Sequence, residues 1–128
     1  MNTCDNLYMS ISLYVLQLSY EATKSVRRKY KISFNLLYVL IGCYSYTTLV
    51  NKQFSFTSIV NIVRIYNSVR LRKYFDILNN LGLVYQSSNK GSIKYYSLSD
   101  KGIDMINEII KEYNRCLYEF CNKYNVDL

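Results

Sequence analysis

Apolar residues recur along the first twenty positions of the chain at the spacing of an amphipathic helix. Steps of four, three and four residues place them on one face. The residues on this stripe are Leu7, Ile11, Tyr14 and Leu18. Asp5 is a suitable N-cap, so we expect a helix from about Asp5 to Lys29. The stripe fades after Tyr20, where a run of basic residues takes over.

Three further helices are expected in the middle of the chain, over about Ser33–Tyr44, Thr57–Val63 and Ser68–Leu81. The first of these is apolar on most of its sides, so it should be central to the core. The short one should point Ile59, Val60 and Val63 inward. The last can be capped by Asn67 or Ser68 and ended by Gly82.

From Leu83 onward the pattern changes from that of a helix to that of strands. Leu83–Gln86 and Ser92–Leu98 are expected to form the two strands of a β-hairpin. Ser87–Gly91 is expected as the turn between them, because Asn89-Lys90-Gly91 supplies turn-forming residues. Ser99 or Asp100 then opens a last helix.

The last helix carries an apolar seam with heptad spacing over about three heptads. Its members are Ile103, Ile106, Ile110, Tyr113, Leu117, Phe120 and Tyr124. Such a seam packs either onto its own domain or onto a second copy of the chain. Because the first helix is amphipathic as well, and 128 residues leave little else to cover both, we expect the two terminal helices to form a homodimer. The expected dimerisation residues are Leu7, Ile11, Tyr14, Leu18, Ile106, Ile110, Tyr113, Leu117 and Phe120.

The whole sequence fits one domain that is mainly α with a small β-hairpin, in the α+β class. Its net charge of +7 is concentrated in residues 22–102, which hold 13 Lys and Arg against two acids. A basic middle between slightly acidic ends is typical of a domain that binds a polyanion. The order of elements is that of a winged helix-turn-helix, which places one helix in the major groove of DNA and the hairpin against an adjacent groove or the phosphates.

Two segments resemble the MarR family of winged-helix regulators. Leu78-Asn79-Asn80-Leu81-Gly82-Leu83-Val84 is similar to the end of that family's recognition helix and the start of its wing. Leu98-Ser99-Asp100-Lys101-Gly102 is similar to its wing-to-helix segment. The resemblance covers roughly Phe34 to Ile110. It implies a homodimeric repressor, with helices at about 5–30 and 103–125 joining the copies and a DNA-binding core at about 33–102 with its wing at about 83–98.

Candidate contacts with double-stranded DNA follow from the helix geometry of residues 68–81. Leu71, Tyr74, Phe75 and Leu78 form its inward face, so the opposite face is free for DNA. Arginine there suits guanine edges, whereas lysines there and on the wing suit phosphates. The expected DNA-binding residues are Ser68, Val69, Arg70, Arg72, Lys73, Lys90, Ser92 and Lys94.

The composition argues against an enzyme, a cofactor or a metal site. The chain has no His, few acids and no phosphate-cradling Gly motif. Its four cysteines, at 4, 43, 116 and 121, lack metal-ligand spacing and favour a reduced, cytoplasmic protein, with a redox-sensing thiol as an alternative. The N-terminus also lacks the basic start of a signal peptide.

Four alternatives stay open from the sequence. The winged helix could serve protein–protein interaction, or it could bind DNA in replication, partition or mobile-element control. The uncharged stretch 32–50 is long enough to span a membrane, although polar residues interrupt it and we expect a buried helix followed by a connector from about Ser45. The family resemblance also implies a small-molecule effector, for which Tyr side chains and Cys43 could line a pocket, but no set of residues demands one.

Overall fold

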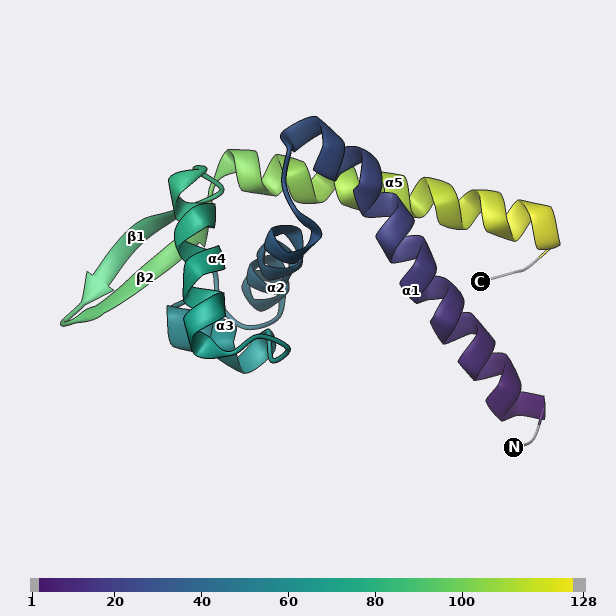
Figure 1. Ribbon diagram of the computed structural model, residues 1–128, viewed down its shortest axis with the longest axis horizontal. Helices are drawn as coiled ribbons and strands as arrows, with labels where there is room; N and C mark the ends of the chain where they lie inside the picture. The colour runs from purple at the N-terminus through teal and green to yellow at the C-terminus, as the bar shows by residue number, and fades with distance from the viewer. Residues whose placement is uncertain (1–2, 126–128) are drawn as a thin grey trace. The chain divides into compact units, whose positions relative to one another are not determined.

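The computed structural model describes the backbone of residues 3–125 and the side chains of residues 13, 14 and 16–125. Its elements are α1 (Thr3–Tyr30), α2 (Phe34–Leu49), α3 (Phe56–Ile62), α4 (Ser68–Asn80), β1 (Val84–Lys90), β2 (Ile93–Leu98) and α5 (Asp100–Tyr124) (Figure 1). Two compact units divide the chain: Met1–Lys31 with Asn107–Leu128, and Ile32–Ile106. Helices with one β-hairpin confirm the predicted fold class.

Helix α2 is the centre of the second unit. It begins after Ser33, whose hydroxyl accepts a hydrogen bond from the Leu36 amide, and its inner side chains are buried. The prediction that it ends near Tyr44 was wrong, because it continues to Leu49. Thr47 and Thr48 fit into this last turn by donating their hydroxyls to main-chain carbonyls four residues earlier.

The membrane alternative concerned this same stretch. Among the residues that the structure describes, no single helix is both long and apolar enough to cross a membrane. One bent pair, Leu16–Tyr30 with Phe34–Leu49, passes by length and composition alone.

Helices α3 and α4 form the helix-turn-helix that packs on α2. A reciprocal pair of hydrogen bonds between Ser55 and Ser58 caps α3 at its start. The α2–α3 contact is close, because a Cβ added to Gly42 would overlap the Val63 side chain. Asn67 caps α4 by accepting a hydrogen bond from the Arg70 amide. Gly82 follows the end of α4 with a φ of +74°, a conformation that suits glycine.

The hairpin differs from its prediction at the turn. Strand β1 continues to Lys90, so most of the predicted turn Ser87–Gly91 is strand, and the reversal lies at Gly91 and Ser92. A register irregularity between Gln86 and Ser88 accommodates the longer strand. Figure 1 shows the hairpin projecting from the helices of its unit.

A third segment pairs with the base of the hairpin and was not predicted. Phe54, between α2 and α3, exchanges two main-chain hydrogen bonds with Tyr96 at 2.9 and 2.8 Å. Both rings are buried, and each meets Phe75 of α4 edge to face. The base of the wing is therefore fixed to the helix-turn-helix by main chain and by aromatic packing.

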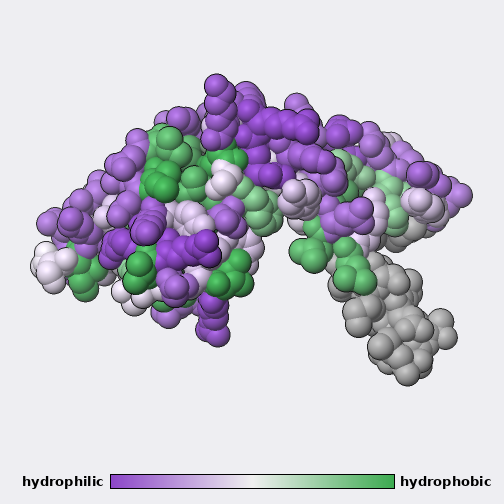
Figure 2. Space-filling view, in the orientation of Figure 1, coloured by the Kyte–Doolittle hydropathy of each residue, from purple (hydrophilic) through white to green (hydrophobic). Residues whose placement is uncertain are grey.

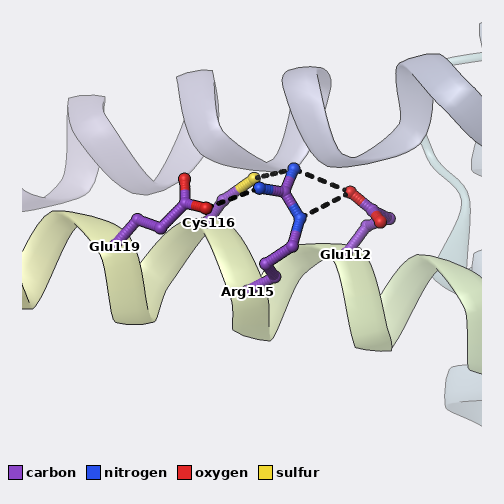
Figure 3. Close-up of polar contacts among 4 residues, drawn as sticks. All are labelled: Glu112, Arg115, Cys116 and Glu119. Atoms are coloured by element: carbon purple, nitrogen blue, oxygen red, sulfur yellow. Dashed lines mark hydrogen bonds and ion pairs between the residues drawn. The ribbon is translucent and has the colours of Figure 1, made fainter.

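The first unit consists of α1 and the greater part of α5. Tyr14 and Phe120 stack with ring centroids 4.0 Å apart, and Lys29 pairs with Glu108 at 2.6 Å. Along α5, Arg115 joins Glu112 and Glu119 one turn away on either side (Figure 3). Asp5 is not the N-cap that we predicted, because α1 already includes Thr3.

Candidate nucleic-acid interface

Helix α4 buries one face and exposes the opposite one. Leu71, Phe75 and Leu78 are at most 1% exposed, because they face the core of the second unit. At 100° per residue, the direction opposite to them passes through Val69, Lys73 and Asn80. All of the predicted α4 contact residues are exposed: Ser68, Val69, Arg70, Arg72 and Lys73.

The three cations of α4 have different surroundings. The Arg72 guanidinium lies 3.8 Å from the centroid of the Phe56 ring, a cation–π contact that holds it at one edge of the exposed face. Arg70 lies at the other edge, and Lys73 projects between them. Among the residues that the structure describes, neither Arg70 nor Lys73 forms an ion pair. Their charges are therefore available to a ligand.

A cluster of tyrosines supports the Arg70 edge. Tyr66, in the turn of the helix-turn-helix, packs edge to face on Tyr38 and Tyr74, and its hydroxyl donates to Asn35 at 2.8 Å. Partial burial raises the pKa of Tyr66, the neighbouring tyrosines raise it further, and Arg70 opposes the shift. The turn before α4 is thus fixed by side chains from α2 and α4.

The wing and α4 share one hollow. Arg72 and Asp76 line it from α4, and Ser92 and Lys94 line it from the hairpin. Arg72 and the two wing residues Ser92 and Lys94, which we predicted separately, are therefore close in space, and Asp76, which was not predicted, lies with them. Lys90 is also exposed, at the start of the hairpin reversal.

Sequence reasoning missed a second polar surface at the outer side of the wing. Asn51 and Gln53 line a shallow hollow there together with Asn89 and Lys90. Ser88 donates a hydrogen bond to Gln53 at 3.1 Å. The short polar stretch before Phe54 could have indicated this surface. We did not connect that stretch with the hairpin, because the segment pairs with the hairpin only through the isolated bridge of Phe54.

The predicted dimerisation residues are placed unevenly in a single chain. Leu18 and Ile106 are buried, so they offer little surface to a second copy. Tyr14, Tyr113, Leu117 and Phe120 are partly exposed, and Ile110 is 39% exposed. The side chains of Leu7 and Ile11 lie outside the described residues. Among the described side chains of the first unit, the most exposed apolar ones were not among those predicted: Leu13, Leu16 and Tyr118.

A helix-turn-helix on a central helix, followed by a hairpin fixed at its base, defines the winged helix-turn-helix fold. Solved structures of MarR-family regulators share it, which confirms the resemblance at the level of the fold. A transcriptional regulator from Thermotoga maritima has a TM-score of 0.74 at 10% identity, over 93% of this chain and 80% of that one.

MepR, a transcription regulator of the Staphylococcus aureus multidrug efflux pump MepA, has a TM-score of 0.71 at 13% identity, over 95% of this chain and 84% of MepR. A MepR–DNA complex has a TM-score of 0.68 at 12% identity, over 93% and 84% of the two chains. No protein-family model matches the sequence, and no curated protein matches it.

Proposed function

We propose that this chain is a transcriptional regulator that binds double-stranded DNA as a homodimer and represses by occupying its site. The observation that carries the proposal is the exposed cationic face of α4 beside a wing with two further exposed lysines. The MepR–DNA complex supports it, because that protein has the same fold and is bound to DNA.

The environments of the cations suggest different tasks. Arg70 is exposed in the first turn of α4, the end of a recognition helix that contacts base edges, so it suits the edge of a guanine. Lys73, Lys90 and Lys94 suit phosphates, where charge matters and geometry is loose. Arg72 is held on Phe56 and faces the wing, so we assign it to a phosphate between helix and wing.

A homodimer accounts for the exposed apolar side chains of the first unit. Leu13 and Leu16 are 60% and 69% exposed on α1, and Tyr118 is 69% exposed on α5. Apolar side chains gathered on two helices favour burial against another surface. A second copy of the chain is the occupant that would also place two recognition helices on one duplex.

Fluorescence anisotropy with duplex DNA across a salt series tests the DNA-binding proposal. The natural chain should bind a duplex from upstream of its own gene more tightly than a scrambled duplex, with an affinity that falls steeply as salt rises. Replacing Arg70, Arg72 and Lys73 together with Ala should abolish binding near physiological salt. The log–log salt slope should fall by about 2 per protomer, close to one for each of the phosphate contacts assigned to Arg72 and Lys73.

A matched control removes the same charge elsewhere. Replacing Lys111, Arg115 and Lys123 with Ala also takes away three cations, but from α5, and should leave most of the affinity in place. Equal losses of duplex affinity in the two triple variants would show that binding depends only on the net charge of the chain. An absence of duplex binding at any salt concentration would favour the protein-interaction alternative.

Sedimentation equilibrium tests the dimer separately. Leu16→Lys with Ile110→Lys places charge on two exposed positions, so each chain should still fold while the dimer dissociates. A dimer with an unchanged dissociation constant would show that this surface is not the interface.

Repression itself is measured as loss of transcription from a template that carries the bound site.

A further inference from the structure

Val69 is the most exposed apolar side chain of α4. It is the second residue of the helix and is 70% exposed, so it takes no part in packing the core. A β-branched residue at this place also does little for helix formation. Neither the fold nor the helix therefore accounts for valine at this position.

The surroundings of Val69 distinguish it from other exposed apolar residues. Single exposed side chains of this kind are common and need no explanation. Val69, however, lies beside Arg70, Arg72 and Lys73, and it lines a hollow together with Arg70, Lys73 and Ile77. Figure 2 shows the same mixture, with hydrophobic patches among hydrophilic side chains over α4. A ligand complementary to this surface combines negative charge with an apolar group at one point.

Duplex DNA carries such a group in its major groove. The C5-methyl of thymine is the apolar feature among the base edges there, and phosphates flank the groove on both sides. Uracil lacks this methyl, and the major groove of an RNA duplex is too deep and narrow for side chains to reach the bases. The chemistry of the surface therefore fits thymine in DNA better than any group in RNA.

We propose that Val69 reads the C5-methyl group of a thymine, so that the preferred duplex carries a thymine at the base pair that faces the first turn of α4. The proposal rests on the proposed DNA-binding function and specifies what one residue of it recognises. Because Val69 is at the N-terminal end of α4, it occupies the part of a recognition helix that contacts base edges.

The test uses the full-length chain and a duplex selected by it from a random pool. Each thymine of the selected duplex is replaced in turn by deoxyuridine, which removes one methyl and leaves the base pairing unchanged. Replacement of the thymine that Val69 contacts should weaken binding about fourfold, the effect expected from one buried methyl group. If no replacement changes the affinity, or if no preferred sequence emerges, the proposal is wrong.

Three variants locate the effect. In Val69→Ser the sensitive thymine should become equivalent to deoxyuridine, whereas Val69→Thr keeps one methyl and should retain the difference. Leu49→Ser is the matched control: it removes a side chain that is 80% exposed at the end of α2 and should leave the difference unchanged. Persistence of the thymine effect in Val69→Ser would show that another residue reads the methyl.

The outcomes of these experiments distinguish the reading of thymine by Val69 from the proposed DNA-binding function. Salt-dependent duplex binding with no sensitivity to deoxyuridine would overturn the reading by Val69 and leave DNA binding in place. Failure of the natural chain to bind any duplex would overturn both. Circular dichroism of the three variants confirms that they fold, and the exposure of both positions predicts that they do.

Discussion

Gly102, the third residue of α5, faces the main chain of Leu83, between the end of α4 and the start of β1. A Cβ built on it would overlap the carbonyl oxygen of Leu83. That oxygen accepts a hydrogen bond from the Ser99 amide at 3.0 Å, and the Ser99 hydroxyl accepts one from the Gly102 amide at 3.0 Å. The start of α5 and the start of the wing are thus joined through Ser99, and their close approach at Gly102 depends on the missing side chain.

Gly102→Ala should therefore destabilise the chain, against the usual trend. In an ordinary helix the change would stabilise by about 1 kcal/mol. Here the added methyl costs about 1–3 kcal/mol as overpacking. Displacement of Leu83 also weakens the hydrogen bond from Ser99, which costs a further ~1 kcal/mol. We expect a net loss of about 2 kcal/mol, or a fall in Tm of about 8 °C for a chain of this size.

Urea and thermal denaturation followed by circular dichroism measure this loss. Asp104→Ala is the control, because it makes an exposed change two residues further along α5 and should alter stability by at most about 0.5 kcal/mol. A Gly102→Ala chain as stable as the natural one would refute the reasoning, since it would mean that the main chain at Leu83 yields without cost.

Three further predictions concern single side chains. Burial raises the pKa of the Cys43 thiol. The free energy of unfolding should therefore fall as the pH rises above about 8.5, because the unfolded chain loses the thiol proton there while the folded chain keeps it. Urea melts of Cys43→Ala should show a weaker decline between about pH 7 and 9.5. Arg72→Met keeps the side-chain stem over Phe56 but removes the charge. Thermal melts should show a loss of unfolding free energy of at most about 1 kcal/mol, and the salt slope of duplex binding should fall by about 1 per protomer. A salt slope equal to that of the natural chain would contradict the assignment of Arg72 to a phosphate. Glu108→Gln removes the exposed ion pair with Lys29 and should leave the midpoint of a urea melt almost unchanged, because solvent screens an exposed pair. A clear shift of the midpoint would show that the pair is not simply a surface contact.

Much of the second unit, which holds the helix-turn-helix and the wing, was readable from local signals. Leu71, Phe75 and Leu78 recur at helical spacing, and they are the side chains that α4 buries. Gly82 ended the helix where predicted, because a left-handed residue there is a local requirement. The exposure of the cations then followed from the same helical geometry.

The hairpin turn and the terminal helices were harder to predict for a physical reason. Ser88 and Asn89 have turn-like composition, but pairing with β2 keeps both in the strand, and such cross-strand contacts are not visible in a local window. On α5 the heptad pattern emphasised Ile103 and Ile110, yet both are exposed, while Met105 and Ile109 are buried. Two apolar faces overlap on this helix, and the sequence alone does not say which of them packs within the chain.

The bridge between Phe54 and Tyr96 also determines how the wing responds to force. Phe54 holds the hairpin at Tyr96, and Gln53 holds it at Ser88, so the part of the hairpin free of that segment contains the pairs Asn89–Lys94 and Lys90–Ile93. At about 3.3 Å per residue, the free part from Asn89 to Gly91 is on the order of 10 Å long. Bending of the tip is therefore mechanically separate from the base, so the wing can adjust to the surface it meets while α4 keeps its orientation.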